Sequence, residues 1–179
     1  MNDLTVNQHK QGSKGPCNFY IITISTSRSA KYGDTSSPLD AEDRSGQLME
    51  EMILTAGHKL SGYSLISDNK GAILDTVTNA LRSGADIVVT SGGTGLTSKD
   101  VTIESVVPMF EKNIQGFGEL FRYKSMAQIG VSVILTRACA GVVAGKAVFC
   151  LPGSPAAVEL ALKEIIIPEA GHIVRHVRE

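Results

Sequence analysis

Short apolar runs alternate with amphipathic helical segments through the first half of the chain, and this alternation restricts the possible folds more than any other feature. The runs at 19–24, 63–66 and 87–90 predict strands, and helices are expected at 46–56 and 70–83 between them. The first and third runs have too few polar residues for a solvated face, which is typical of strands inside a sheet. Strand–helix–strand repeats of this length form right-handed βαβ units. The sequence therefore predicts an α/β fold with a mainly parallel sheet.

The second half of the chain continues this pattern less regularly. Its last helix is the clearest element, because Ser154 suits the N-cap and Pro155 the first helical position. Pro168 is expected to end or kink that helix. The other elements are expected, in order, as a helix at 101–107, a helix over 120–127, a strand at 131–135, a hairpin-like excursion at 141–146 and a strand at 148–151.

Two polar segments fall outside the pattern. Residues 1–16 are expected to form a flexible tail, which leaves 17–179 as a single domain long enough for one sizeable core. The segment 29–44 is rich in Ser, Asp, Gly and Pro and is long for a connection within a compact domain. Loops of this length tend to be functional or disordered.

A glycine-rich loop follows the third strand directly and is the strongest local sign of a binding site. Glycines accept positive φ and lack a Cβ atom, so successive N–H groups can point into one concavity that suits a phosphate. If 97–100 opens a helix, the positive end of its dipole strengthens the site. Neither the Walker A nor the dinucleotide-binding template fits, and a turn that binds nothing is the alternative. The loop consists of Ser91, Gly92, Gly93, Thr94 and Gly95.

Three loops are expected to meet at one edge of the sheet. The loops at 25–28, 67–69 and 91–100 all follow strands, and ligands of parallel sheets bind outside the carboxyl ends of the strands. Arg28 stands in the first of these loops among hydroxyl side chains. It is a candidate contact for a second anionic group, and a solvated loop capped by its own serines is the alternative.

Three motifs of this chain resemble those of one family. They are SGGTGLTSKDVT from residue 91, GFGELFR at 116–122 and LPGSP at 151–155. In these motifs, and from residue 18 onward, the chain is similar to the MogA/MoaB family of molybdenum cofactor biosynthesis, the molybdopterin adenylyltransferases. GFGELFR is closer to the MoaB branch. The resemblance implies a three-layer αβα fold with a mainly parallel central sheet.

The resemblance also implies a reaction. The family transfers the AMP moiety of ATP to the terminal phosphate of molybdopterin, releasing pyrophosphate, and a MoeA-type metal insertase then uses the adenylylated product. The attacking phosphate monoester is largely dianionic at neutral pH, so it needs no general base. The reaction instead requires that two polyanions are brought into line and that their charge is neutralised. This requirement implies Mg²⁺ held by carboxylates, together with backbone and cationic donors.

The family resemblance assigns roles to individual residues. Asp68 and Asp100 match the family's acidic positions and are expected to hold Mg²⁺ and position the substrates. Structural roles compete with this assignment, because Asp68 suits an N-cap and 97–100 fits a capping box in which Asp100 bonds back to the helix start. The glycine-rich loop is expected to cradle phosphates and the pterin. The adenine nucleotide pocket is expected to be shaped by Gly116, Gly118, Glu119, Pro152, Gly153 and Ser154.

Several alternatives remain open beside this assignment. Glu119 could instead form a salt bridge with Arg122 at helical spacing. The chain could be a catalytically silent molybdopterin-binding or scaffold protein, or a nucleotide hydrolase resembling the CinA domain, because one fold hosts several functions. Homologues form trimers, and the MoaB branch forms hexamers, so the resemblance also implies a homo-oligomer.

Composition restricts the partners and the location. The 17 basic and 18 acidic residues give a net charge of -1, which argues against a nucleic acid or an anionic membrane as the main partner. No segment has the roughly 18 apolar residues of a membrane span, and no apolar signal core opens the chain. Three cysteines without a C-x-x-C pair indicate reduced thiols, so a cytoplasmic protein is expected.

A histidine pair near the end of the chain is a further candidate for a metal site. His172 and His176 would share one helical face if the helix continues past Pro168, and such a pair can bind zinc. No third ligand is nearby, and Arg175 and Arg178 are adjacent. The sequence therefore favours a solvated helix end.

Overall fold

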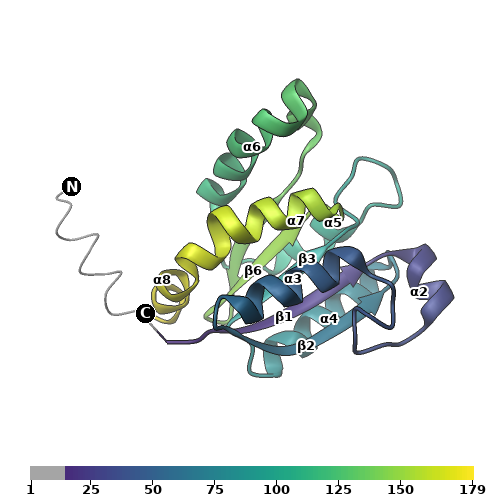
Figure 1. Cartoon of the computed structure of the whole chain (residues 1–179), viewed down its shortest axis with the longest axis horizontal. Coiled ribbons are helices and arrows are strands. Elements are labelled where there is room, and N and C mark those ends of the chain that lie inside the picture. Colours follow the sequence, from purple (N-terminus) through teal and green to yellow (C-terminus); the bar gives the residue numbers. More distant parts are fainter. Residues whose placement is uncertain (1–14) are drawn as a thin grey trace.

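One mixed sheet forms the centre of the protein in the computed structural model, which describes residues 15–179 (Figure 1). Within that range the strands are β1 (Asn18–Ile24), β2 (Lys59–Ile66), β3 (Ile87–Ser91), β4 (Lys112–Asn113), β5 (Cys139–Val143) and β6 (Lys146–Leu151). The strand order is β2-β1-β3-β6-β5-β4. β1 runs parallel to β2 and β3, and β3 runs parallel to β6, whereas β5 is antiparallel to β6 and β4. The predicted α/β fold with a mainly parallel sheet is confirmed.

Helices cover both faces of this sheet. The α-helices of the described range are α2 (Thr26–Tyr32), α3 (Arg44–Thr55), α4 (Lys70–Arg82), α5 (Thr102–Val106), α6 (Gln115–Ile129), α7 (Pro155–Ala161) and α8 (Ile167–Arg178), with short 3₁₀ or π segments at η1 (Val107–Met109), η2 (Gly130–Leu135) and η3 (Leu162–Ile166). α3, α6, α7 and α8 pack on one face, and α4 and α5 pack on the other (Figure 1). The result is a three-layer αβα arrangement.

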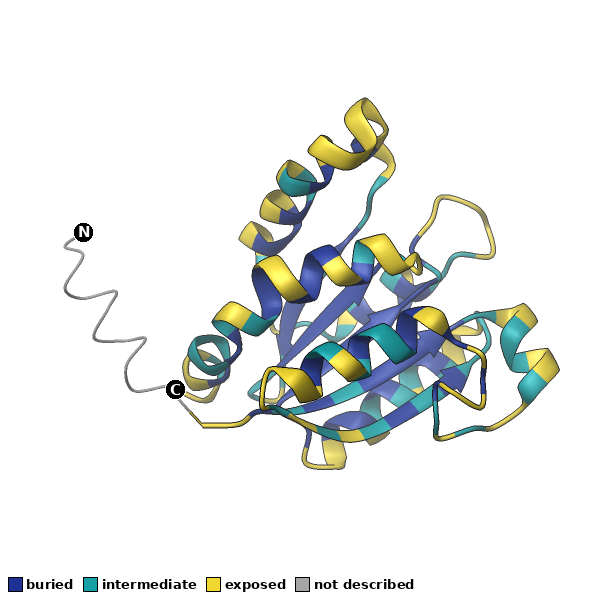
Figure 2. Ribbon diagram, viewed as in Figure 1, coloured by how far each residue is buried: buried dark blue, intermediate teal, exposed yellow. Residues whose placement is uncertain are grey.

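The strands separate two apolar clusters because successive side chains of a strand point to opposite faces. In β1, Phe19 and Ile21 belong to the cluster under α3 and α7, while Ile22 belongs to the cluster under α4. β3 alternates in the same way, and all five of its residues are buried. Figure 2 shows the central strands as the most continuously buried part of the molecule. The sheet therefore holds the loops at its ends on a rigid base.

A carboxylate ties the chain together at the edge where β1 and β3 begin. The side chain of Asp86 accepts a hydrogen bond from the backbone N–H of Asn18 at 2.9 Å, and Arg178 donates to its other oxygen. Burial, with the charge of Asp86, raises the pKa of the nearby Cys17 thiol. Asp86 thus joins the end of α8 to the start of β1.

The segment after β1 differs from the prediction. Instead of the hydroxyl-rich loop expected at 25–28, α2 begins at Thr26, and the Oγ of Ser25 caps it by accepting from the N–H of Arg28 at 3.4 Å. α2 buries none of its residues, so it has no apolar stripe for a sequence pattern to show. The long loop expected at 29–44 is correspondingly shorter, and α3, which was expected from residue 46, begins at Arg44 with Asp43 as its N-cap.

In the second half of the chain, one predicted strand is wrong and one predicted hairpin turn is confirmed. The residues expected as a strand at 131–135 form the 3₁₀ segment η2, and the strand that pairs with the free edge of β5 is β4. β-branched residues in that segment mimic a strand pattern. The hairpin expected at 141–146 is present as the β5–β6 turn, with positive φ at Ala144 and Gly145. Pro168 does not end the last helical stretch, which runs from α7 through η3 into α8.

The predicted tail at 1–16 lies, apart from Gly15 and Pro16, outside the described residues. The assignment of 17–179 to a single domain stays a prediction. Among the residues that the structure describes, no helix is long and apolar enough to cross a membrane.

Candidate active site

The carboxyl ends of the parallel strands meet at one edge of the sheet, as predicted. The N–H of Ser25, after β1, donates to the carbonyl of Ile66 at the end of β2 at 2.8 Å. The N–H of Gly92, after β3, donates to the carbonyl of Leu151 at the end of β6 at 3.0 Å. These bonds between neighbouring loops fix the place where the candidate site is built.

The glycine-rich loop has a backbone that only glycine accommodates at two positions. Gly92 and Gly93 have φ values of 106° and 62°. A Cβ atom on Gly92 would lie 2.2 Å from the carbonyl oxygen of Ile24, and one on Gly153 would lie 3.2 Å from the Cα of Gly92. The positive φ expected of this loop is confirmed, and so is its close approach to neighbouring backbone.

The carbonyl groups of the loop are held by two side chains from later elements. Thr102 of α5 donates through Oγ1 to the carbonyl of Gly92 at 2.9 Å, and its N–H donates to Gly93 at 3.0 Å. Arg137 donates through Nε to the carbonyl of Thr94 at 3.0 Å. Within residues 15–179 the N–H groups of Gly93 and Thr94 have no hydrogen-bond partner, so they are available to an anion.

The helix expected to open at 97–100 is absent from that position. These residues form a turn, with the N–H of Asp100 donating to the carbonyl of Thr97 at 3.1 Å, and α5 begins only at Thr102. Because α5 has just five residues, its dipole adds little, and the expected contribution of a helix N-terminus to anion binding is wrong. The loop itself supplies the free donors.

Asp100 turns back over this loop. Its Oδ2 accepts from the N–H of Thr97 at 3.0 Å and from the Thr97 hydroxyl at 2.6 Å. The hydroxyl bond is the largest of the effects that lower the pKa of Asp100. A Cβ atom on Gly95 would lie 2.8 Å from Oδ2. The bond back to Thr97 that the capping-box pattern predicts is present, but it closes a turn and leaves an ionised carboxylate beside the glycines.

Asp68 reaches the same loop from the end of β2. Its Oδ2 accepts from the N–H of Thr26 at 3.0 Å and from the Thr26 hydroxyl at 2.9 Å. Its Oδ1 would lie 2.7 Å from a Cβ atom on Gly93. Asn69, and not Asp68, caps α4 by accepting from Ala72. The capping alternative for Asp68 is therefore wrong, and both aspartates flank the glycine-rich loop.

A cavity of about 460 Å³ opens beside the loop. Its walls include the ends of β1 and β3, the start of α3 and the turn before α7, with Ser91 and Gly153 on it. Ser45 donates through Oγ to the carbonyl of Gly153 at 2.9 Å, which joins two of these walls. Arg28 lines the cavity too, but its guanidinium donates to the carbonyls of Ala41 at 3.1 Å and Glu42 at 2.5 Å.

The residues expected to form one adenine pocket are divided between two places. Gly118 and Glu119 line a separate hollow of about 320 Å³ between α6 and the start of β5. Gly116 stands at the exposed start of α6. Arg122 lines the same hollow, and no ion pair joins it to Glu119 within the described chain. The other three expected residues, Pro152, Gly153 and Ser154, form the turn before α7, where Ser154 is the N-cap as predicted.

Several residues at this edge of the sheet contribute to the candidate site but were not predicted from the sequence. Thr26 and Thr102 hold the two ends of the candidate site, yet single hydroxyl residues in polar segments give no pattern. Arg137 pairs with Glu104 of α5 through Nη1 at 2.5 Å and Nη2 at 3.3 Å, and this contact lowers the pKa of Glu104. Asp43 is buried beside the cavity. Only its position as the N-cap of α3 could have drawn attention to it.

Asp68 and Asp100 are enough to hold a metal ion only if a substrate supplies further ligands. No group of three His, Cys, Asp or Glu side chains able to hold a metal occurs among residues 15–179. Mg²⁺ in nucleotide sites is commonly bound by one or two carboxylates together with phosphates and waters. Asp68 and Asp100 beside a loop with free N–H groups match that donor set. His172 and His176 do share one face of α8, with ring centroids 4.6 Å apart.

A family model and individual relatives of known name place this chain in the same family. Residues 20–172 match the family described as "Probable molybdopterin binding domain". The molybdenum cofactor biosynthesis protein B of Bacillus cereus is 41% identical over 95% of this chain and 96% of its own length. The molybdopterin adenylyltransferase of Pyrococcus furiosus is 41% identical over 97% of this chain and 99% of its own length.

A solved structure agrees with the sequence comparison. The tungsten cofactor synthesizing protein MoaB from Pyrococcus furiosus superposes with a TM-score of 0.80 at 41% identity, covering 92% of this chain and 98% of that one. Its fold is thus shared over almost the whole of both chains. This chain belongs to the molybdopterin-binding domain family that contains the MoaB proteins.

Proposed function

We propose that this protein transfers the AMP moiety of ATP to the terminal phosphate of molybdopterin, giving adenylylated molybdopterin and pyrophosphate. One observation supports this most directly. Two aspartates, from the loops after β2 and β3, are each held by a threonine hydroxyl and flank a glycine-rich loop with free N–H groups. That combination suits two polyanions and the metal between them. Relatives named for this pathway and this activity cover nearly the whole chain.

In the proposed reaction the chain positions charges and moves no proton. A phosphate oxygen of molybdopterin forms a bond to the α-phosphorus of ATP while the bond from that phosphorus to the bridging oxygen of pyrophosphate breaks. Gly93 and Thr94 donate to phosphate oxygens through their free N–H groups, and Asp68 and Asp100 would hold Mg²⁺. The ion, when bound, supplies charge neutralisation on the phosphates. Arg137 keeps the loop in place through its bond to the Thr94 carbonyl.

The remaining candidate residues receive supporting roles in this proposal. Gly118 and Glu119 line the hollow under α6, where part of the nucleotide would lie, with Gly116 at its margin. The turn of Pro152, Gly153 and Ser154 touches the cavity beside Ser91 and would lie between the two substrates. Free thiols at Cys17 and Cys139 accord with a cytoplasmic location. A MoeA-type metal insertase would receive the product.

The decisive experiment supplies molybdopterin, Mg²⁺ and ATP labelled at the α-phosphate, and measures label in a pterin product. Wild type is expected to transfer label, and Asp100→Asn to lose about 10²–10³-fold of the rate, as for removal of one group that stabilises transition-state charge. Asp75→Asn, an exposed acid on α4, is the matched control. Binding of molybdopterin without label transfer would favour the silent alternative, and release of free AMP would favour a hydrolase.

We also propose that the protein works as a homo-oligomer, a trimer or a hexamer. α6 and η2 extend from the body of the molecule (Figure 1), and much of this part of the ribbon is coloured as exposed (Figure 2). An exposed apolar patch of this kind usually marks a contact surface. The exposed residues are Leu120, Tyr123, Met126, Ile129, Val131, Ile134 and Leu135.

A further inference from the structure

Two cysteines lie directly opposite each other on neighbouring strands. Cys139 is the first residue of β5, and its register partner is Cys150 near the end of β6. Both are free thiols, and the Cys150 thiol donates a hydrogen bond to the Cys139 sulfur. The Cα atoms of opposite residues in an antiparallel pair are about 4.5–5.5 Å apart, within the roughly 4.4–6.8 Å that a disulfide spans. The pair is therefore placed to form a disulfide.

The two thiols differ in accessibility and in acidity. Cys139 is partly exposed and lines the hollow of about 320 Å³ between α6 and β5, so a small oxidant can reach its sulfur. The hydrogen bond from Cys150 and the charge of Arg137 together lower the pKa of the Cys139 thiol despite its burial. Cys150 is fully buried, and its bond to Cys139 and its burial raise the pKa of its thiol. An accessible, acidic cysteine beside a second thiol is typical of redox-sensing sites.

We propose that Cys139 and Cys150 are a reversible redox site, at which hydrogen peroxide forms a disulfide that loosens the glycine-rich loop. The Cys139 thiolate attacks one peroxide oxygen and the O–O bond breaks. The other oxygen leaves as hydroxide and takes up a proton to become water, and Cys139 becomes a sulfenic acid. The Cys150 sulfur then loses its proton and attacks the Cys139 sulfur, and the sulfenic oxygen leaves as a second water. One peroxide and two thiols thus give one disulfide and two waters.

Closing this bond displaces the start of β5. A disulfide holds its Cβ atoms about 3.8 Å apart, whereas the Cβ atoms of opposite strand residues are about 4.5–5.5 Å apart. β6 lies between β3 and β5 in the sheet and is buried over almost its whole length, so it resists movement. Residues 136–138, just before β5, belong to no helix or strand. The movement therefore falls on Cys139 and on these residues.

Arg137 is one of these residues, and it connects the redox site to the glycine-rich loop. Its Nε donates to the carbonyl of Thr94 at 3.0 Å, and its Nη1 pairs with Glu104 at 2.5 Å. Movement of Arg137 weakens both contacts and releases the loop that carries the free N–H groups. The expected loss of activity rests on the proposed function, whereas formation of the disulfide does not. A strained disulfide is also readily reduced, so the change is reversible.

The test treats the reduced full chain with hydrogen peroxide, blocks the remaining thiols and maps the cysteines by mass spectrometry after trypsin digestion. Trypsin cleaves after Arg137 and Lys146, so the two cysteines fall on the separate peptides 138–146 and 147–163. In wild type these peptides are expected as a linked pair that dithiothreitol separates. A link between two chains, seen as a doubled mass on a non-reducing gel, would overturn the proposal.

Three variants identify the thiols that react. Cys150→Ala should abolish the link and leave a sulfenic acid at Cys139 that dimedone labels. Cys139→Ser, at a partly exposed position, should abolish both the link and the label. Cys17→Ala removes the third thiol, next to the start of β1 at the opposite edge of the sheet. It is the matched control and should form the link as wild type does.

Amide hydrogen exchange measures the effect on the loop independently of activity. Exchange in residues 92–95 should become faster in oxidised wild type and return to its original rate after dithiothreitol. Transfer of AMP should fall at least about 10-fold on oxidation and recover in the same way, because displacement of positioning groups is costly. Peroxide should change neither exchange nor transfer in Cys139→Ser.

The outcomes separate this inference from the proposed function. Absence of the linked peptides in peroxide-treated wild type would overturn the redox site, whatever the activity. A reversible link with unchanged exchange in residues 92–95 would overturn its coupling to the loop. If the link forms and exchange responds, but reduced wild type transfers no label, the redox site stands and the proposed function fails.

Discussion

At the scale of single residues, the candidate site depends on hydroxyl groups that hold carboxylates. Thr26 holds Asp68 and Thr97 holds Asp100, each through both its N–H and its hydroxyl. Such bonds orient a carboxylate, and at Asp100 the Thr97 hydroxyl also lowers the pKa of the carboxyl group. Substitution of either threonine is therefore expected to affect the aspartate that it holds.

Thr97→Val should change the pH dependence of the reaction. The Thr97 hydroxyl is the largest cause of the lowered pKa of Asp100 in the folded protein. Its removal lets that pKa rise toward its ordinary value, so the fraction of ionised Asp100 falls at mildly acidic pH. The acid limb of kcat/KM against pH is expected to move to higher pH, while the rate near neutral pH changes little. Ser98→Ala, which removes a neighbouring hydroxyl, is the control, and an unshifted limb in Thr97→Val would contradict the role of Asp100.

Gly92→Ala should destabilise the fold strongly. Its Cβ atom would lie 2.2 Å from a backbone oxygen at a φ of 106°, so strain and overlap combine to cost about 3 kcal/mol or more of the free energy of unfolding. Gly57 after α3 has a similar φ of 81° and open space around it, so Gly57→Ala should cost only about 1–2 kcal/mol. Urea denaturation of both variants measures the difference. Equal losses would show that the overlap at Gly92 is relieved by backbone movement.

At the scale of elements, the short helix α5 acts mainly as an anchor for the loop before it. Thr102→Val should leave the carbonyl of Gly92 without its side-chain donor and cost about 1–3 kcal/mol. Amide hydrogen exchange in residues 92–95 should also become faster. Thr78→Val on α4 is the matched control, because the Thr78 hydroxyl bonds only within its own helix, and it should cost less than about 0.5 kcal/mol. Unchanged exchange in the loop of Thr102→Val would rule out the anchoring role.

The elements also show what the sequence could predict. Helices α3, α4 and α7 were predictable because each buries one apolar face, which leaves a helical period in the sequence. Strands β1, β3 and β6 were predictable as short apolar runs, because they are buried on both faces. β2 was predicted only over its second half, 63–66, because its first half contains no buried residue. α2 buries nothing, so it left no period. η2 carried a strand-like run, because β-branched residues look alike whether they pack in a sheet or stand in solvent.

The candidate site was predictable to a similar extent. The glycine-rich loop could be found because its backbone demands glycine, which is visible in the sequence. Asp43 could be noticed only as a possible N-cap of α3, because the hydrogen bonds to its side chain come from Thr23 of β1 and Tyr63 of β2. Long-range side-chain contacts of this kind have no local signature.

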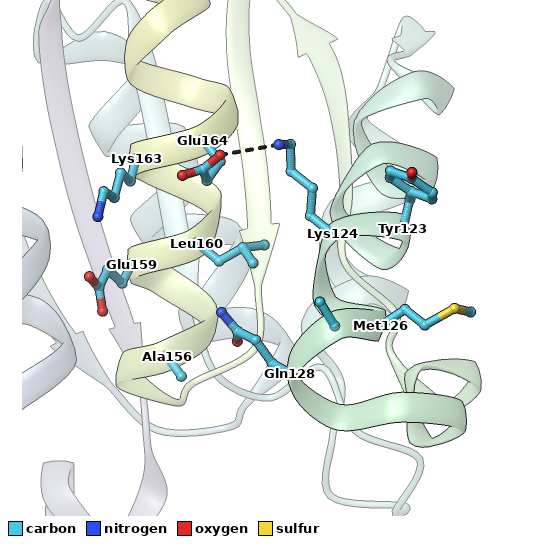
Figure 3. Close-up of a pocket in the computed structure, with 10 residues that line it drawn as sticks. Tyr123, Lys124, Met126, Gln128, Ala156, Glu159, Leu160, Lys163 and Glu164 are labelled. Carbon is cyan, nitrogen blue, oxygen red and sulfur yellow. Dashed lines mark hydrogen bonds and ion pairs between the residues drawn. The ribbon is translucent and has the colours of Figure 1, made fainter.

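At the scale of the whole molecule, α6 and η2 form a surface whose apolar side chains are not covered by the rest of the described chain. Val131 and Ile134 are 82% and 80% exposed. A groove of about 630 Å³ separates α6 from α7 and η3 (Figure 3), and the ion pair of Lys124 with Glu164, at 3.1 Å, spans it. The apolar surface and the groove lie next to each other, so a second copy of the chain could contact both.

Replacing both exposed residues with lysine, Val131→Lys and Ile134→Lys, is expected to shift the protein toward monomers. Each lysine would bury a charge in the contact, while the isolated chain loses nothing, because both positions are in solvent. Light scattering after size exclusion measures the mass. Thr55→Lys with Asn79→Lys adds the same charge at exposed positions elsewhere, and should leave the mass unchanged. A monomeric wild type, or a double variant of unchanged mass, would exclude this surface as the contact.

The tie at Asp86 has a practical consequence for handling the protein. Asn18 and Arg178 both bond to this carboxylate, so β1 starts and α8 ends at the edge of the sheet opposite the glycine-rich loop. A fusion partner, an affinity handle or a solid support joined to the C-terminus would therefore stand on the side that faces away from the substrates. Tethered molecules should keep an unobstructed entrance, which makes this end of the chain the preferred attachment point for surface-based binding measurements.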